Sequence, residues 1–364
     1  MTWGQRKRFS DGKVNLPYKQ FLGYERGENK DDPPIINPEQ AVTVRLIYRM
    51  FMEGKTAVAI AKKLTEEGIP TPAGKEVWRT STITSILQNE KYRGSAMLQK
   101  SFTADFLTKK KKVNEGEVPR YYIEHSHEAI IAPEEWDAVQ EEIARRKVLG
   151  RAYSGNSVFS AKIKCGDCGG WYGSKVWHSN DPYRSRIWQC NCKYRENKPR
   201  CETPNLREDD VRSRFLKAYN SMIINKKPYL EACVTVKTVL TDTCEIDTEL
   251  RELESEMEIV TELARKNIME NAFSMKREEF EIKQDAYAKR LEGMEARRTE
   301  LLTQRAERQT KAKAIDRFIG MLKKRKDLLT EFDSVLWLTS IENATVHRDG
   351  SMTFRFNSGT EITI

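Results

Sequence analysis

Four of the seven cysteines stand at a spacing that suits a tetrahedral metal site. Cys165 and Cys168 form a C-x2-C knuckle that two glycines follow, and Cys190 and Cys201 come later in the chain. A C-x2-C turn delivers two thiolates to one ion, and the glycines let the backbone fold around it. Four cysteines fill all positions around zinc and leave no place for a catalytic water. The pattern predicts one structural Zn²⁺ ion.

Cys190 and Cys201 have the spacing C-x10-C, which is less specific than a second C-x2-C. The ligand set therefore has two alternatives. Cys192 is an alternative to Cys190, and His178 is an alternative to one of the thiolates. The remaining cysteines, Cys233 and Cys244, are interpreted as structural or incidental. The chain starts with a basic stretch that no apolar run follows, so it shows no secretory signal. Cysteines in the reducing cytoplasm favour metal binding over disulfides.

The residues between the cysteine pairs predict a β-hairpin. Trp171 to His178 and Tyr183 to Cys190 are rich in aromatic and β-branched residues, and a short polar segment with a proline separates them. This is typical of a zinc ribbon. Lys175, Arg184 and Arg186 are candidate contacts to DNA phosphates or bases. The alternative is that these basic side chains only keep a small module in solution.

Net charge indicates the class of partner. The chain has 364 residues, a net charge of +9 and a pI of about 9.0, which favours a polyanion, either nucleic acid or an anionic membrane. No apolar run approaches the roughly 18–20 residues that a membrane-spanning helix needs. Acidic residues outnumber basic ones between residues 245 and 310. A DNA-binding surface is therefore expected outside that segment, since like charge repels phosphates.

A helix is expected to follow Asn37, which suits a capping position, and Pro38, which suits the first helical position. It is expected to end at Gly54. The residues on its apolar face recur at helical spacing: Val42, Leu46, Ile47 and Met50.

Two shorter helices are expected next, and they suit a helix-turn-helix. The first covers about Thr56 to Glu67, with Val58, Ile60, Ala61 and Leu64 on its buried side. The second starts near Thr80 and has a polar face on which the candidate base or phosphate contacts lie: Arg79, Ser81, Thr82 and Ser85. The connecting segment from Ile69 to Trp78 is longer than usual, so an ordinary pair of packed surface helices is the alternative.

Heptad-like spacing of apolar residues predicts a coiled coil between about residues 245 and 310. The pattern weakens between Asn267 and Ser274, which predicts two antiparallel helices joined at a tip. Ile268, Met269 and Phe273 near that tip are candidate protein contacts. The alternative is a seam used only within one chain.

The C-terminal part is expected to complete the zinc-ribbon domain. A helix is predicted from about Ala314 to Phe332, followed by strands on either side of Asp349-Gly350 and a final strand after Gly359. These strands are too few to stand alone, so we expect them to pack on the zinc ribbon. The coiled coil would then be an insertion within that domain. We found no zinc-protease, P-loop or dinucleotide-binding motif.

Several segments together resemble the C-terminal portion of the large serine recombinases, which are phage integrases and transposon recombinases. Residues 21–24 (FLGY), 60–64 (IAKKL), 68–72 (GIPTP) and 89–94 (NEKYRG) resemble that family's recombinase domain in order. Residues 165–170 (CGDCGG) and 188–190 (WQC), followed by Cys201, resemble its zinc ribbon with an embedded coiled coil. Cys192 departs from the family pattern, in which a polar residue is usual.

The resemblance implies an α+β protein without the N-terminal domain that carries the family's serine nucleophile, and therefore no enzyme by itself. It implies a linker from the missing domain over 1–18, a recombinase domain over 19–150, a linker over 151–157 and a zinc-ribbon domain over 158–364. Arg6, Arg8 and Lys13 would follow the DNA backbone or minor groove.

The implied function is binding of attachment-site double-stranded DNA in a bacterial cytoplasm, with the coiled coil contacting other recombinase subunits and no membrane partner. Two other classes of protein fit the same modules. One is a free-standing transcriptional regulator. The other is a coiled-coil adaptor whose basic charge is incidental.

Overall fold

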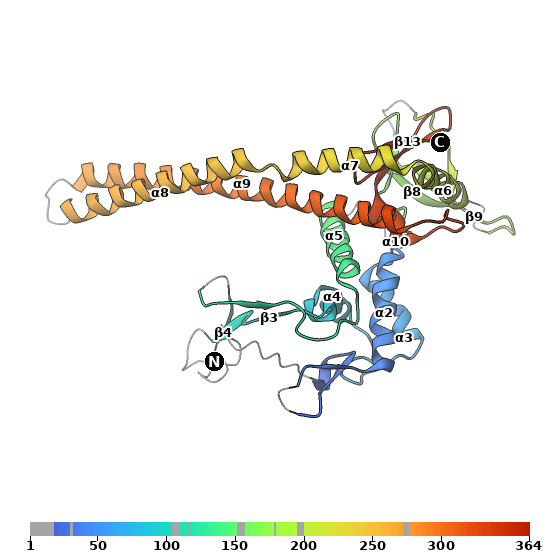
Figure 1. Cartoon of the computed structure of the whole chain (residues 1–364), viewed down its shortest axis with the longest axis horizontal. Helices are drawn as coiled ribbons and strands as arrows, with labels where there is room; N and C mark the ends of the chain where they lie inside the picture. The colour runs from blue at the N-terminus through green and yellow to red at the C-terminus, as the bar shows by residue number, and fades with distance from the viewer. Residues whose placement is uncertain are drawn as a thin grey trace. The chain divides into compact units, whose positions relative to one another are not determined.

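The computed structural model describes residues 18–29, 32–103, 110–114, 117–150, 157–177, 180–194, 200–271 and 277–364. Contacts group them into two compact units. The first holds the described residues up to Leu216 together with Glu331–Phe354 and Thr363–Ile364, and the second holds Lys217–Thr330 and Arg355–Ile362. Figure 1 shows a mixed helical and stranded chain, which confirms the α+β class.

The first unit begins with a 3-10 helix η1 (Tyr18–Gln20) and a short antiparallel pair, β1 (Tyr24–Glu25) and β2 (Ile35–Ile36). The predicted helix follows as α2 (Pro38–Met52), and Asn37 caps it by accepting a hydrogen bond from the Gln40 amide at 3.1 Å. Gly54 ends this segment with a φ of +92°, in the region that favours glycine.

The predicted helix pair forms α3 (Ala57–Glu66), capped by Thr56, and α4 (Thr80–Gln88). Ile60, Leu64 and Ile83 are buried as expected, but Val42 and Val58 are 62% and 63% exposed. The prediction that these two valines belong to the buried faces was wrong. Each valine is turned away from the buried face of its helix, which Val44, Ile47 and Tyr48 form in α2 and Ile60, Ala61 and Leu64 form in α3.

A β-rich segment and a long helix complete the recombinase-like part of the first unit. A 3-10 helix η2 (Glu90–Arg93) leads into two antiparallel pairs: β3 (Ala96–Leu98) with β6 (Tyr121–Ile123), and β4 (Ser101–Thr103) with β5 (Lys111–Val113). The helix α5 (Pro133–Leu149) then packs against α2 and α4.

The expected hairpin of the cysteine module is present. β8 (Tyr172–Trp177) pairs antiparallel with β9 (Ser185–Cys190), and β10 (Leu206–Arg207) adds a third strand on the other side of β9. A second sheet has the order β13-β12-β11-β7, formed by β7 (Ile163–Cys165), β11 (Ile341–Val346), β12 (Met352–Phe356) and β13 (Glu361–Thr363).

The parallel pairing of β11 with β7 confirms that the C-terminal strands join the ribbon. Ala344 pairs with Ile163 and Val346 with Cys165. The core beside this sheet is aromatic, and each of its rings lies within 6.3 Å of at least one other, centroid to centroid: Phe159, Trp188, Phe215, Phe332, Trp337 and Phe354. The short helix α10 (Ser334–Ser340) supplies Trp337, which is fully buried.

Four helices lead from the ribbon into and out of the arm: α6 (Glu208–Ile224), α7 (Lys226–Thr241), α8 (Cys244–Asn271) and α9 (Arg277–Lys324). The last two run antiparallel and side by side, as expected (Figure 1). Ile246, Leu250 and Leu301 form their buried seam, and Arg297 pairs with Glu249 across it at 2.7 Å. The separate helix predicted for 314–332 was wrong, because α9 continues without a break to Lys324.

Candidate metal centre and nucleic-acid interface

The connecting segment between α3 and α4 is held by Trp78, which is 4% exposed. Its indole Nε1 donates to the carbonyl oxygen of Ile69 at 2.7 Å, and its amide donates to Oγ1 of Thr65 at 3.0 Å. At the other end of α4, the buried hydroxyl of Tyr48 donates to the carbonyl oxygens of Ile86 and Leu87. These bonds fix the position of α4 despite the long connection.

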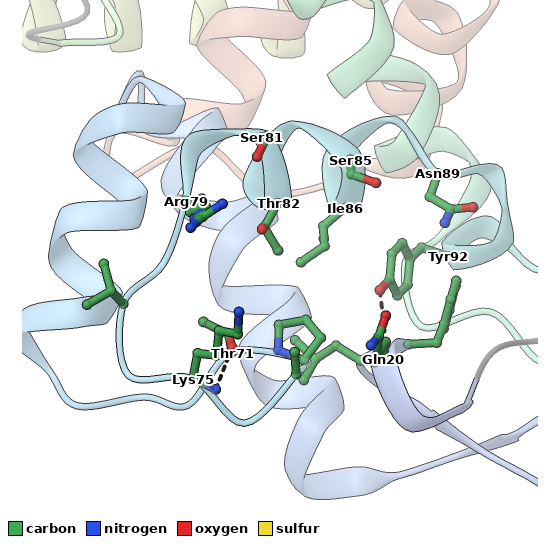
Figure 2. A pocket seen from close by; sticks show the side chains of 15 residues that line it. Gln20, Thr71, Lys75, Arg79, Ser81, Thr82, Ser85, Ile86, Asn89 and Tyr92 are labelled. Atoms are coloured by element: carbon green, nitrogen blue, oxygen red, sulfur yellow. Dashed lines mark hydrogen bonds between the residues drawn. The ribbon is translucent and has the colours of Figure 1, made fainter.

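The exposed side of α4 borders an open groove of about 450 Å³. All four α4 residues that the sequence singled out line it: Arg79, Ser81, Thr82 and Ser85. Figure 2 shows Thr82 and Ile86 facing Thr71 and Gln20 across this groove.

Sequence reasoning missed the residues that line the opposite side of the groove, including Gln20, Thr71 and Lys75. They lie in segments without helical or strand periodicity, so no local pattern marked them. The groove therefore combines hydroxyl, amide and basic groups. This chemistry suits hydrogen bonds to base edges and phosphates.

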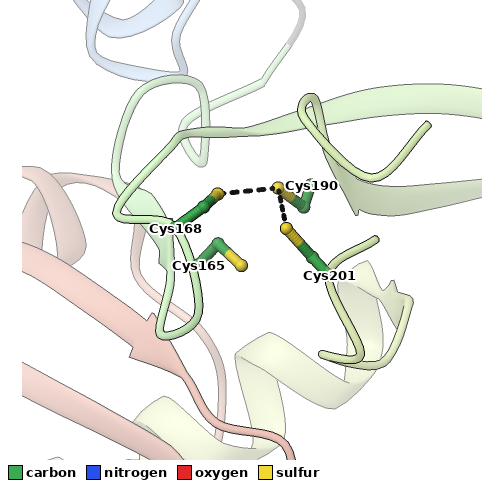
Figure 3. A group of neighbouring side chains, drawn as sticks. All are labelled: Cys165, Cys168, Cys190 and Cys201. Atoms are coloured by element: carbon green, nitrogen blue, oxygen red, sulfur yellow. Dashed lines mark hydrogen bonds between the residues drawn. The ribbon is translucent and has the colours of Figure 1, made fainter. Parts of the chain in front are cut away.

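The four predicted cysteine ligands lie together, and Figure 3 shows Cys165 and Cys168 on one turn facing Cys190, at the end of β9, and Cys201. Their sulfur atoms all lie within 4.8 Å of one another. Cys190 Sγ lies 3.5 Å from Cys168 Sγ and 3.8 Å from Cys201 Sγ. Four sulfurs at the usual zinc–sulfur distance of about 2.3 Å stand about 3.8 Å apart at tetrahedral corners. The residues fit a structural zinc ion.

The protonation of the thiols also fits a bound cation. Burial raises the pKa of Cys190 and raises that of Cys201 to about 11. Burial acts in the same direction on Cys168, but the Gly170 amide and the neighbouring thiols outweigh it and bring this pKa to about 7. A bound cation would favour the thiolate forms of Cys190 and Cys201 against the effect of burial.

Cys192 stands beside the cluster. Its amide donates to Cys190 Sγ at 3.3 Å, so its backbone supports a ligand. Its sulfur is 3.0 Å from the point at which a Cβ on Gly170 would lie, but it does not belong to the group of four. His178, the other alternative ligand, lies outside the described residues.

The far end of the β8–β9 hairpin presents basic and aromatic side chains together. Lys175, Arg184 and Arg186 are exposed, as are Trp177 at 45% and Tyr183 at 80%. In the sequence analysis, Trp177 and Tyr183 contributed only to the prediction of the hairpin strands and were not named as possible contacts. Basic side chains gathered at an exposed hairpin suit contact with a nucleic acid, because they can pair with its phosphates.

Two family models match this chain. Residues 38–146 match the one described as Recombinase, and residues 158–220 match the one described as Recombinase zinc beta ribbon domain. The chain therefore contains a recombinase domain and a recombinase zinc β-ribbon domain. These domains support a function in DNA recombination, and all four cysteines of the cluster fall within the zinc-ribbon match over residues 158–220.

A solved structure that is similar to this chain is described as a crystal structure of an LSR–DNA complex. The two share 18% identity over 96% of this chain and 99% of the other, with a TM-score of 0.34.

Some of the remaining predicted site residues lie within the part of the chain that the structure describes, and others lie outside it. Arg6, Arg8, Lys13 and Phe273 lie outside the described residues. Ile268 and Met269 lie in the last turn of α8 and are 51% and 64% exposed. Among the described residues, no helix is both long enough and apolar enough to cross a membrane.

Proposed function

We propose that this chain binds the attachment-site DNA of a site-specific recombination system at two places. The groove along α4 reads one segment of double-stranded DNA, and the β8–β9 hairpin of the zinc ribbon reads another. The observation that carries this proposal is that Arg79, just before α4, and Ser81, Thr82 and Ser85 within it line one open groove. One structural Zn²⁺ ion on Cys165, Cys168, Cys190 and Cys201 holds the base of the hairpin.

The test is selection of bound duplexes from a random DNA pool with the full chain, zinc and moderate salt. A recombinase half-site requires enrichment of a long site with two separated clusters of preferred bases. Ser85→Ala should relax the preference within one cluster and leave the other unchanged. Ser255→Ala, on the outer side of α8, is the matched control. A weak, sequence-independent and salt-sensitive preference would favour the adaptor alternative.

Zinc is the structural cofactor in this proposal, because four cysteine sulfurs within 4.8 Å of one another suit tetrahedral coordination of one ion. Removing it with a chelator should unfold the hairpin base and abolish one of the two base clusters. The same result is expected for Cys165→Ser, with α2, α3 and α4 still folded. Site binding that is unchanged in this variant would contradict the proposal.

We also propose that the end of the α8–α9 arm contacts another recombinase subunit. The support is the exposure of Ile268 and Met269 at the end of α8, whereas Ile246, Leu250 and Leu301 form a buried cluster near the base of the arm. Replacing both with serine should weaken association of DNA-bound subunits, measured by sedimentation. Leu302→Ser, at a half-exposed position of α9 far from the tip, is the control. Unchanged association would favour a seam used only within one chain.

Strand cleavage is assigned in this proposal to a serine-nucleophile domain outside the residues described here, in a protein that acts in the bacterial cytoplasm. The purified chain should bind attachment-site DNA and leave it uncut. A covalent protein–DNA product from this chain alone would contradict that assignment.

A further inference from the structure

A fifth cysteine borders the predicted zinc site. Cys192 stands two residues after Cys190, just beyond the end of β9, and its backbone amide donates to Cys190 Sγ at 3.3 Å. Its own sulfur lies outside the group of four that suits the ion. The thiol of Cys192 is therefore held next to the zinc site without being one of its four ligands.

Cys192 and the ligand Cys168 face the same small space beside Gly170. A Cβ at position 170 would lie 3.0 Å from Cys192 Sγ and 3.2 Å from Cys168 Sγ. The Cβ of Cys192 is 4.0 Å from that point, farther than its sulfur, so the side chain is aimed into this space. Because glycine has no Cβ, residue 170 leaves the space open. The two sulfurs need only close this gap to reach the roughly 2.05 Å of a disulfide bond.

Exposure distinguishes Cys168 from the other ligands. Cys168 is exposed and Cys192 is half-buried, whereas Cys165, Cys190 and Cys201 are buried. Oxidation of a cysteine requires access of the oxidant to its sulfur. An oxidant in solution therefore reaches Cys168 before the other three ligands.

Cys190 is the competing partner for an oxidised Cys168, since their sulfurs lie 3.5 Å apart. With zinc bound, however, Cys190 is itself a ligand. A disulfide between two ligands would remove half of the coordination, whereas a disulfide from Cys168 to Cys192 removes a single sulfur. Cys192 is thus the partner that disturbs the fewest metal–sulfur bonds.

We propose that Cys168 and Cys192 form a peroxide-sensitive disulfide site at the edge of the zinc centre. The Cys168 thiolate attacks hydrogen peroxide, so that a sulfur–oxygen bond forms, the oxygen–oxygen bond breaks and the leaving hydroxide takes a proton from solvent. The thiol of Cys192 then attacks this sulfur. A sulfur–sulfur bond forms, and the hydroxyl group leaves with the thiol proton as water. The two sulfurs together lose two electrons, and one peroxide becomes two waters.

The disulfide leaves three ligands, Cys165, Cys190 and Cys201. A structural zinc site takes four, so we expect the ion to be released. Under the proposed two-site reading of DNA, the oxidised chain would lose the base cluster of the β8–β9 hairpin and keep the one read along α4. This last consequence rests on the proposed function, whereas the disulfide rests on the cysteines alone.

The test treats the full chain, loaded with zinc, with hydrogen peroxide. A coloured chelator reports released zinc, and tandem mass spectrometry locates disulfides, with fragmentation at Asn191 separating Cys190 from Cys192. We expect a single disulfide between Cys168 and Cys192, and zinc release in proportion to it. A dithiol reductant should reverse both changes.

Cys192→Ser keeps the four ligands and removes the thiol that traps oxidised Cys168. Without that trap, Cys168 should proceed to the sulfinic acid, which a dithiol does not reduce, so the share of chains that bind zinc again after reduction should fall by at least about twofold. Cys244→Ser removes an exposed thiol of α8 and is the matched control. It should recover zinc as the natural chain does.

The outcomes separate this proposal from the proposed function. A natural chain that forms a disulfide between two of the four ligands, or no disulfide, overturns the oxidation site, and this arm needs no variant. Equal zinc recovery in Cys192→Ser and the natural chain also overturns it. A selected DNA pool without two base clusters would instead overturn the proposed function and leave the oxidation site standing.

Discussion

The guanidinium of Arg348, on the turn between β11 and β12, donates from Nε to Oδ1 of Asp167 at 2.7 Å. Asp167 lies inside the C-x2-C knuckle, and its other oxygen accepts from the amide of Glu202 at 2.7 Å. Because Glu202 follows the ligand Cys201, this one carboxylate links the first cysteine pair, the last cysteine and the C-terminal hairpin. The ligands are thus positioned from three parts of the chain.

Asp167→Ala should weaken zinc binding by about tenfold, because outer partners of metal ligands typically contribute tenfold to a hundredfold in affinity. Competition with a coloured zinc chelator measures this. Asp349→Ala, which removes a carboxylate from the same turn as Arg348, should leave the zinc affinity unchanged. Equal affinities for the natural chain and Asp167→Ala would show that the backbone alone positions the ligands.

Cys190→Ser and Cys192→Ser should behave differently. The first removes a sulfur from the group of four and should abolish stoichiometric zinc binding. The second keeps all four sulfurs and the amide bond to Cys190 Sγ, so zinc stoichiometry should stay at one. Metal content after dialysis gives the answer. If Cys192→Ser lost zinc and Cys190→Ser retained it, Cys192 would be the zinc ligand in place of Cys190.

Arg79→Ala should weaken DNA binding about equally for all sequences, with a salt dependence that is shallower by about one unit in the log–log slope. The reason is that Arg79 lies at the start of α4 on the groove, where a phosphate contact releases one counterion. Titrations at several salt concentrations measure the slope. Arg265→Ala, on the acidic arm, is the charge-matched control. A loss confined to one base position would mean that Arg79 reads a base.

In the Lys162→Met variant, the free energy of unfolding should increase less steeply with pH than in the natural chain. Burial first, and then the charge of Arg145, lower the Lys162 pKa to about 7, while Glu142 and Glu342 act in the opposite direction. Between that value and the ordinary 10.5, the unfolded chain binds more protons, so the free energy of unfolding increases with pH.

Urea denaturation at pH 7, 8 and 9 tests this. The natural chain should show a slope steeper than Lys162→Met by up to about 1.4 kcal/mol per pH unit. Lys147→Met, at an exposed position, should follow the natural chain. Parallel pH profiles for the natural chain and Lys162→Met would mean that Lys162 stays charged in the folded protein.

Features that short-range chemistry determines could be predicted from the sequence. Asn37 and Thr56 marked the starts of two helices. At each start the side-chain oxygen accepts a hydrogen bond from a backbone amide that would otherwise be unpaired. The glycines after the C-x2-C knuckle and the aromatic and β-branched residues that follow predicted the β8–β9 hairpin. The antiparallel arm followed from a heptad pattern that weakens where the chain turns back.

Features that depend on partners distant in the sequence could not be predicted. The three residues of β7 are too few to show alternation, so nothing indicated their parallel pairing with β11. Glu142 and Arg145 looked like ordinary charges of a surface helix, although one is buried and the other bonds to Ala161. The break expected near residue 314 was wrong, although the sequence held a sign against it: no glycine or proline stands between residues 294 and 319, and α9 runs on to Lys324.

The pairing of β7 with β11 also has a consequence for synthesis of the protein. Cys165, at the end of β7, leaves the ribosome before the whole of α8 and α9, whereas its sheet partner Val346 follows them. Until Val346 emerges, β7 keeps an open hydrogen-bonding edge, and the amine of Lys162 lacks its carbonyl partners in α10 and β11. The zinc ribbon therefore starts to form before the arm is translated and finishes only after it.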